Sequence, residues 1–390
     1  MEVIMFHSIG CVDSSWSRNY LTVDWKHFEK FCEYLKKSKI ETLSLEEWYS
    51  RGSNLITETS KKEIVLTFDD GYLDNWVFAY PILKKFGLKG TIFINPEFID
   101  PGTNVRLNLD DCRANKADIN KLEFLGFMNW PEIKEVDDSG ILDVQSHSMS
   151  HNFYFKSSKI IDYYSGQKEY DWLAWYYEPD QKPFYITENQ KELVPYGTPI
   201  FEFGRALGLR RYFPSESTVE YAIDYYSRSG KKIEGRGDFK PQYLDACNQF
   251  VNNSDNKGRF ESDFELEKRY RYELFEGKRI LEENLKKKVE FLCWPGGGYN
   301  ELSVKLSIEA GYKASTLSSL ESKNSIDNTG YYKRIVRNGL SANIQTRKKL
   351  HPLPYNLALV HSFKAKRNII YKLLLKAISL VYKVWDFKLN

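Results

Sequence analysis

Seven short apolar runs, separated by segments with helical spacing, most strongly constrain what this 390-residue chain can fold into. Runs that are apolar at consecutive positions are typical of strands buried on both faces, as in parallel sheets covered by helices. We therefore predict an α/β fold, either an α/β barrel or a doubly wound sheet. The predicted strands are Val3–Phe6, Ile64–Phe68, Thr91–Asn95, Leu142–Gln145, Val289–Trp294, Ala314–Leu317 and Tyr331–Val336. Helices are predicted over Trp25–Lys37, Trp76–Phe86 and about 263–288.

One stretch interrupts this alternation of strands and helices. More than a hundred residues separate His151 from the next predicted strand at Val289, which is far more than one crossover needs. Aromatic residues are dense in this stretch, and they make up 15% of the whole chain. We expect an insertion over about 153–260 that forms a lid or a subdomain on a barrel spanning 1–363.

Charge is distributed unevenly between the body of the chain and its end. The net charge is +3, whereas residues 364–390 hold seven basic residues and one acidic residue. The rest is slightly acidic, so nucleic-acid binding, which needs a basic domain, is not expected. We expect the 364–390 tail to form an amphipathic helix that either lies on an anionic membrane surface or docks on the barrel. Its apolar side is formed by Ile370, Leu374, Ala377, Val381 and Trp385.

The cysteines and the N-terminal residues indicate the compartment. The five cysteines are scattered and include no CxxC pair, so neither a zinc finger nor a disulfide framework is expected. Such use suits a reducing compartment. The first residues lack the basic region and the cleavage site of a signal peptide. No apolar run reaches the ~18 residues of a membrane span. The expected location is the cytoplasm.

Chemically active side chains directly follow the predicted strands. His7 follows the first strand, Asp69 and Asp70 follow the second, and His147 follows the fourth. Active sites of parallel α/β folds lie at the carboxyl ends of their strands, so we expect one shared site. One aspartate can bind a cation while the other acts as a base. With His151, two imidazoles and a carboxylate suit catalytic Zn²⁺ or Fe²⁺. Helix caps and surface histidines are the structural alternative.

Two motifs carry a resemblance to a known family. The sequence TFDDG at 67–71, followed by HSMSH at 147–151, resembles the polysaccharide deacetylase family, also called the NodB-homology or carbohydrate esterase family 4 group. The likeness continues through PILKKFGLKGTIFIN, FLCWPGGGYN and EAGYKAST, and the segment MFHSIG resembles the circularly permuted branch. The resemblance implies a distorted (β/α)7 barrel. It also implies a hydrolase that removes acetyl groups from N-acetylated sugars by cleaving a carbon–nitrogen bond other than a peptide bond.

The same resemblance implies a role for each motif residue. Asp69 is the general base that takes a proton from the attacking water. Asp70, His147 and His151 hold a divalent metal ion, with Zn²⁺ as the first expectation and Co²⁺, Ni²⁺ or Fe²⁺ as alternatives. His7 is the general acid that protonates the leaving amine.

The third motif departs from the family pattern. The backbone N–H of Gly296 stands where the family has its oxyanion donor. The family's base-orienting arginine is absent, because Cys293 and Trp294 occupy that place. Arg334 and Arg337, at the end of the seventh predicted strand, are the candidates to replace it. Trp294 is either a core residue or a platform for a sugar ring.

The identity of the acid and of the substrate stays open at this level. His361 in LALVHSF resembles a C-terminal motif of unpermuted family members and is the alternative acid. We expect an N-acetylated saccharide, linked to a lipid or a nucleotide, in surface polysaccharide or lipopolysaccharide biosynthesis, with the protein peripheral on the inner membrane face. The alternatives are a catalytically silent carbohydrate-binding protein on the same fold, an O-acetyl esterase, and a membrane-docked assembly partner that depends on its tail.

Overall fold

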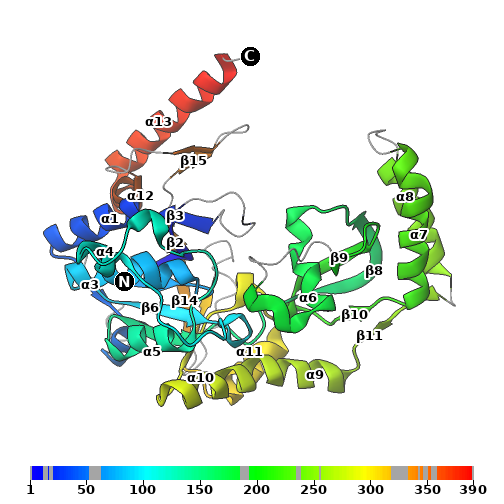
Figure 1. Ribbon diagram of the computed structural model, residues 1–390, viewed down its shortest axis with the longest axis horizontal. Coiled ribbons are helices and arrows are strands. Elements are labelled where there is room, and N and C mark those ends of the chain that lie inside the picture. The colour runs from blue at the N-terminus through cyan, green and yellow to red at the C-terminus, as the bar shows by residue number, and fades with distance from the viewer. Residues whose placement is uncertain are drawn as a thin grey trace.

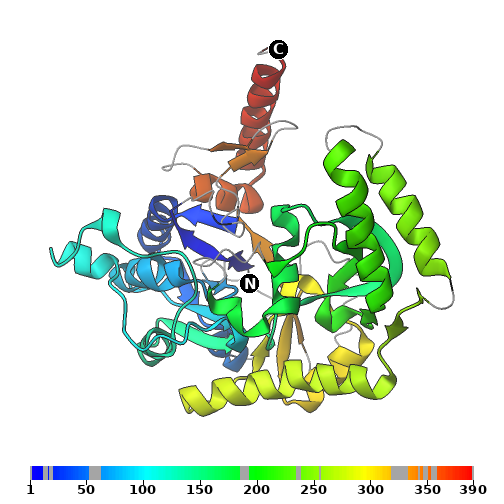
Figure 2. The same ribbon diagram turned by 45° about the vertical axis from the view of Figure 1, so that its right-hand side comes forward.

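The predicted strands pair into one parallel sheet in the computed structural model of the chain (Figure 1). Helices surround this sheet, and a second group of strands and helices lies beside it (Figure 2). The structure describes residues 2–11, 16, 21–51, 63–184, 193–233, 239–253, 256–317, 333–340, 343–345, 350–352 and 358–388.

Seven strands close into a barrel. The strand β1 pairs in parallel with β14 on one side and with β5 on the other, which completes the ring. The barrel prediction is therefore confirmed and the doubly wound alternative is wrong. In ring order the strands are β1 (Glu2–Phe6), β5 (Glu63–Phe68), β6 (Gly90–Ile94), β7 (Leu142–Ser146), β12 (Phe291–Leu292), β13 (Ala314–Leu317) and β14 (Lys333–Gly339).

Three details differ from the predicted strands. A short strand that was not predicted, β4 (Glu41–Leu43), pairs with the first half of β5. The strand β12 covers only the middle of the predicted run. The strand β14 continues to Gly339, while its predicted first residues, 331–332, lie outside the described residues. Arg337 therefore lies within a barrel strand and not after it.

The register of the sheet brings the predicted site residues to the same rim. Phe6 pairs with Phe68, so His7 and Asp69 follow directly opposite positions. The amide of Asp69 continues the ladder and donates to the carbonyl of Phe6 at 3.1 Å. In the same way Ser146 pairs with Leu292, so His147 and Cys293 are neighbours. Parallel pairing thus places these segments at the carboxyl end of the barrel.

The barrel helices match the predicted helical segments. The helix predicted over Trp25–Lys37 is confirmed with the same bounds. The predicted helix over Trp76–Phe86 begins with a π-helical turn, and a second π-helical turn divides the helix predicted over about 263–288. These elements are α1 (Trp25–Lys37), α2 (Leu45–Ser50), η3 (Asn75–Ala79), α3 (Tyr80–Phe86), η4 (Pro96–Phe98), α4 (Leu109–Arg113), η5 (Ile119–Lys121), α5 (Trp130–Asp138), α9 (Asp263–Arg271), η11 (Tyr272–Glu276), α10 (Gly277–Leu285), η12 (Pro295–Gly297) and α11 (Glu301–Glu309).

The long stretch between β7 and β12 forms a substructure of its own. A two-stranded antiparallel sheet of β8 and β9 lies between α6, on the side of the barrel, and α7 and α8 on the outer side (Figure 1). Buried aromatic side chains such as Trp172, Phe201 and Tyr243 fill this substructure and extend to Phe98 and Phe127 of the barrel. Its elements are β8 (Phe153–Tyr163), η6 (Lys168–Leu173), α6 (Ala174–Tyr177), η7 (Pro179–Phe184), β9 (Pro199–Arg205), η9 (Ala206–Gly208), β10 (Tyr212–Phe213), α7 (Glu216–Ile233), α8 (Phe239–Asn252) and β11 (Arg259–Phe260).

The C-terminal segment consists of two helices with different surroundings. The helix α12 (Ala358–Arg367) packs on α1, where the ring of Phe363 lies 5.4 Å from that of Phe31. The helix α13 (Ile369–Lys388) projects from the body (Figure 1). Within the described residues, none of the helices has the length and apolar character needed to cross a membrane. The remaining short strands are β2 (Ser8–Gly10), β3 (Thr22–Asp24), β15 (Asn343–Gln345) and β16 (Leu350–Pro352).

Candidate active site

A cavity of about 690 Å³ opens at the carboxyl end of the barrel. The barrel contributes one wall, and the segment 153–205 contributes the opposite one with three aromatic rings and several charged groups. The predicted site residues therefore share one space with the insertion. The barrel side is lined by His7, Asp69, Asp70, His147, His151, Trp294, Gly296 and Arg337, and the other side by Phe153, Lys168, Glu169, Asp171, Trp172, Trp175 and Arg205.

Asp69 is held by a guanidinium from the neighbouring side of the barrel. Arg337 places Nη1 2.5 Å from Oδ1 and Nη2 2.9 Å from Oδ2, in a bidentate ion pair that is almost fully buried. Burial alone raises the pKa of the Asp69 carboxyl, but the charges of Arg337, His7 and His147 together with the hydrogen bond from Arg337 outweigh burial, and the pKa is lowered. Asp69 is therefore an oriented carboxylate that favours its negatively charged form.

His7 faces the same carboxylate from the end of β1. Its Nε2 lies 3.7 Å from Oδ2 of Asp69, and 23% of its side chain is exposed to the cavity. Burial lowers the pKa of His7, although Asp69 and Asp70 act in the opposite direction. In this one cavity, Asp69 therefore favours its charged form and His7 favours its neutral form.

Asp70 points away from Asp69 and toward the two motif histidines. Its Oδ1 lies 3.1 Å from Nε2 of His147 and 3.3 Å from Nε2 of His151. His147 is oriented from behind, because its Nδ1 lies 2.8 Å from the carbonyl oxygen of Cys293. A carbonyl only accepts, so the proton of a neutral His147 sits on Nδ1 and the lone pair of Nε2 faces Asp70. This is the tautomer of a metal ligand.

The donor set at this point fits a divalent metal ion. Asp70, His147 and His151 are buried, and their ligand atoms lie within 4.8 Å of one another. A carboxylate with two imidazoles leaves coordination positions for water and substrate. Asp69, His147 and Cys293 form a second group with the same spacing, but there Arg337 already supplies a cation, with Nη2 3.0 Å from the sulfur. The residues therefore fit one metal ion at the Asp70 side.

Sequence comparison identifies this part of the chain. Residues 57–187, which include both motifs, match the family model described as polysaccharide deacetylase. This region of the chain is similar to polysaccharide deacetylases. The Bacillus subtilis protein named "Putative polysaccharide deacetylase YxkH" is 39% identical over 97 residues, which cover 24% of this chain. The chain spans only 31% of the length of that curated relative.

Solved structures of other deacetylases are similar at low identity. A de-N-acetylase from Aggregatibacter actinomycetemcomitans is 15% identical with a TM-score of 0.47, covering 86% of this chain and 93% of that one. The BpsB deacetylase domain from Bordetella bronchiseptica is 14% identical with a TM-score of 0.49, covering 87% and 95%. The assignment of this chain to the circularly permuted branch stays a prediction.

The third motif forms a tight turn beside the metal-ligand set. Gly296 has a φ of 52°, and a Cβ there would lie 2.2 Å from Nε of Arg205, so a residue with a side chain would be strained and would displace the Arg205 guanidinium. Trp294 is 2% exposed and packs against Tyr299 with ring centroids 5.5 Å apart. It borders the cavity as a core residue more than as an open platform.

Of the predicted candidates, His361 does not line the cavity. His361 lies on α12 with its ring 5.5 Å from that of Tyr371, and it is not among the residues that line the cavity. The backbone of Arg334 pairs with Ser315, but its side chain lies outside the described residues. Of the two arginines named as replacements for the missing family arginine, Arg337 is the one that contacts Asp69.

The sequence predicted the insertion but not which of its residues line the cavity. Arg205 ends β9, lies 3.8 Å above the ring of Phe153, and has Nη1 3.3 Å from Nδ1 of His151. Trp172 and Trp175 line the same wall. The aromatic density of 153–260 pointed to this region, but no motif distinguished these residues from other buried aromatics.

Proposed function

We propose that this chain is a metal-dependent hydrolase that removes acetyl groups from N-acetylated sugars. The observation that carries the proposal is the division of the two aspartates. Asp69 is held bidentately by Arg337 as a charged base, while Asp70 meets His147 and His151 as a ligand set in the same cavity. Metal-assisted hydrolysis of an amide uses both an oriented base and a Lewis acid, and the site offers groups for both.

Asp70, His147 and His151 would hold the metal ion. When bound, a divalent metal polarises the acetyl carbonyl and lowers the pKa of water. Zn²⁺ is the first expectation for two imidazoles and a carboxylate, with Co²⁺, Ni²⁺ or Fe²⁺ as alternatives.

The protein's own groups then move the protons. Asp69 takes a proton from the attacking water, and the water oxygen forms a bond to the acetyl carbon. The N–H of Gly296 stabilises the negative charge that develops on the acetyl oxygen. His7 donates a proton to the leaving nitrogen as the carbon–nitrogen bond breaks, so the products are acetate and a free amine. His7 is preferred to His361 because it lies in the cavity beside Asp69.

The substrate and its setting follow from the rest of the molecule. The aromatic side chains of the insertion offer apolar faces for sugar rings, which supports an N-acetylated saccharide as substrate. We propose that this saccharide is linked to a lipid or a nucleotide and belongs to the biosynthesis of surface polysaccharide or lipopolysaccharide. The domain division is proposed as a barrel with its insertion over 1–363 and a tail over 364–390.

The projecting helix α13 supports a peripheral place on the cytoplasmic face of a membrane. Ile369, Ile370 and Leu373 are each more than half exposed, and Lys372 and Lys376 are exposed among them. Apolar side chains beside lysines suit insertion at an anionic lipid surface, where each cation contributes about 1 kcal/mol. Part of the predicted tail does not leave the body, because Arg367 pairs with Glu2 at 2.8 Å.

The alternatives differ in what they predict for the site. A catalytically silent carbohydrate-binding protein has no need to hold a base, whereas Arg337 holds Asp69 in place of the missing family arginine. An O-acetyl esterase uses the same groups on an ester. An assembly partner that works through its tail would function without Asp69.

One experiment separates these functions. Acetate release is measured from N-acetylated and O-acetylated hexosamine derivatives, using metal-reconstituted wild-type protein and Asp69→Asn. We expect release from the N-acetylated compounds, lost in the variant and with chelator. Release from the esters alone would indicate the esterase, and release from neither, by a protein that binds Zn²⁺ and the sugars, would indicate the binding protein.

A further inference from the structure

The segment between the two metal-ligand histidines has a strained backbone conformation. Ser148 and His151 both have positive φ values, 61° and 51°, which cost energy for residues with a Cβ. Such a conformation persists only where surrounding groups hold it. The peptide groups of residues 149–152 are accordingly bound from two sides by residues that lie outside the barrel strands.

On one side, the segment is held by Glu273 on the π-helical turn η11. Its Oε2 accepts hydrogen bonds from the amides of Met149 at 3.1 Å and Ser150 at 2.9 Å, and the Ser150 hydroxyl donates to Oε1. The helix comes close at this point, since a Cβ on Gly277 would lie 3.1 Å from the Met149 nitrogen. One buried carboxylate thus binds two consecutive amides of the ligand segment.

On the other side, the segment is held by Lys182 on η7 of the insertion. The Lys182 side chain is 1% exposed, pairs with Glu97, and donates from Nζ to the Ser150 carbonyl at 3.2 Å. Its ammonium group lies 5.7 Å from the ring centre of Phe98 and 5.6 Å from that of Trp175. Burying an ammonium is costly unless it is paired and hydrogen-bonded, so these partners fix where η7 can dock.

Glu97 links the two supports. It accepts from the Tyr272 hydroxyl at 2.8 Å, next to Glu273 on η11, and its own amide donates to the Met149 carbonyl at 3.2 Å. Lys182, Glu97 and Tyr272 therefore connect the insertion, the loop after β6 and the π-helical turn around the ligand segment.

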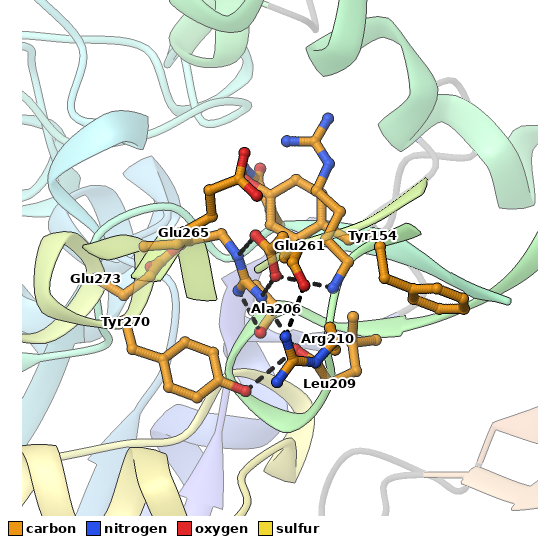
Figure 3. A network of polar contacts seen from close by, with 12 residues as sticks. Tyr154, Ala206, Leu209, Arg210, Glu261, Glu265, Tyr270 and Glu273 are labelled. Atoms are coloured by element: carbon orange, nitrogen blue, oxygen red, sulfur yellow. Dashed lines mark hydrogen bonds and ion pairs between the residues drawn. The ribbon is translucent and has the colours of Figure 1, made fainter. Parts of the chain in front are cut away.

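A second contact from the insertion lies at the end of the segment. The amide of Ala206, directly after β9, donates to the Asn152 carbonyl at 3.0 Å. The turn 206–209 is itself fixed by α9, because Arg269 donates to the carbonyls of Ala206 at 2.6 Å and Leu209 at 3.0 Å while pairing with the buried Glu261 (Figure 3). The insertion is thus tied to the barrel helix on both sides of the ligand segment.

We propose that the aromatic-rich insertion is a structural part of the metal centre, and that Lys182 is a positioning residue for the ligands His147 and His151. The inference rests on the proposed metal site. The insertion does more than cover the cavity, because the carbonyl of Ser150 lies between the two histidines and is bound by Lys182. Loss of this contact removes one of the groups that hold the positive φ values, so the imidazoles are held less firmly in place.

The test is the metal affinity of Lys182→Met in the full chain. Methionine keeps an unbranched apolar side chain that is one atom shorter, but it removes the ammonium group with its charge, its hydrogen bond and its position over Phe98 and Trp175. Metal-free protein is titrated with Zn²⁺ in competition with a chromophoric chelator. We expect an affinity about 10- to 100-fold weaker than that of the wild type, the effect typical of residues that orient metal ligands. The Co²⁺ form should also show an altered visible absorption spectrum.

The matched control is Lys159→Met, which removes an exposed lysine of the same insertion. Lys159 is 68% exposed, pairs with Glu202 at 3.4 Å and is not among the residues that line the cavity, so the Zn²⁺ affinity of this variant should equal that of the wild type. Glu97→Gln offers a second route if Lys182→Met fails to fold, because it keeps the shape of the partner and removes only its charge; weaker Zn²⁺ binding is expected again. Wild-type affinity and an unchanged Co²⁺ spectrum in a folded variant would overturn the inference and leave the metal site intact. A wild-type chain that binds no metal would overturn the proposed site itself.

Discussion

The proposed base and the proposed metal ligands lie in one cavity, but different parts of the molecule hold them. Asp69 is fixed by the barrel, through the amide that continues the pairing of β5 with β1 and through Arg337 on β14. His147 is held in the same way, because its amide donates to the carbonyl of Ile94 at 2.9 Å. The segment that leads from it to His151 is fixed from outside the strands, by Glu273 on η11 and Lys182 on η7. The proposed base therefore depends on the register of the sheet, whereas the path to the ligand His151 depends on how later parts of the chain pack on the barrel.

Backbone geometry follows the same division. Asp69 extends a strand, while Asp70, Ser148 and His151 all have positive φ values. These three account for half of the six such non-glycine residues in the described part of the chain. Strained positions of this kind are retained where neighbouring groups over-determine them, and here they coincide with the ligand side of the cavity.

The largest expected effect is on the base side. Asp69→Asn removes the group that takes the proton, so acetate release should fall about 10²- to 10⁴-fold. Because Asp69 is not in the ligand set, Zn²⁺ affinity measured by chelator competition should stay at the wild-type value. A loss of metal affinity as large as the loss of activity would contradict the separation of base and ligands.

Removing the support of the base should destabilise the fold. Arg337→Met leaves the buried Asp69 carboxylate without its partner, and the free energy of unfolding should fall by about 3 to 5 kcal/mol in urea denaturation. The double variant Arg337→Met with Asp69→Asn removes the stranded charge and should recover part of this loss. Equal stability of the single and double variants would show that the ion pair does not hold Asp69.

We expect a smaller effect of pH on the free energy of unfolding, through the buried Asp74 beside β2. Burial raises the pKa of Asp74, which accepts from Ser8 at the start of β2, to about 7. The folded state then binds this proton more tightly than the unfolded state, so stability falls as pH rises between the ordinary carboxyl pKa and 7. Wild type should lose about 2 to 3 kcal/mol between pH 5 and 8 relative to Asp74→Asn. Parallel pH profiles of the two proteins would contradict this.

The smallest effect is expected from α13, which supplies neither the proposed base nor the proposed metal ligands. Lys372→Gln removes one exposed cation from α13 and should weaken binding to phosphatidylglycerol vesicles by about 1 kcal/mol, or roughly fivefold. Binding to neutral phosphatidylcholine vesicles and acetate release from soluble substrate should not change. A change in acetate release would mean that the tail is part of the site after all.

The comparison of the two sides also shows what the sequence could predict. The barrel strands were found because a buried strand is a short, continuous apolar run, and this signal is local. The rim residues His7, Asp69 and His147 follow from those strands by parallel pairing. The sequence limited the arginine partner of Asp69 to two candidates, Arg334 and Arg337, but could not choose between them. Arg337 lies 268 positions from Asp69, and the choice depends on where β14 ends.

The supports of the ligand segment left no comparable signal. Glu273 lies in an ordinary charged helical pattern, and its place depends on the π-helical turn that the pattern does not predict. Lys182 is one of many lysines in the sequence, and its burial follows from how the aromatic substructure packs against Phe98 and Trp175. Side chains that act through tertiary packing alone cannot be distinguished from surface residues of the same type.

The central claim is that Asp69 and a metal ion held by Asp70, His147 and His151 act together in one hydrolytic site. Its most direct test is acetate release from an N-acetylhexosamine substrate by chelator-stripped protein during stepwise addition of Zn²⁺. We predict that the rate rises with occupancy and levels off at one equivalent, and that Asp69→Asn binds the same equivalent without gaining activity. Release that is independent of added metal, or an Asp69→Asn protein as active as the wild type, would contradict the account.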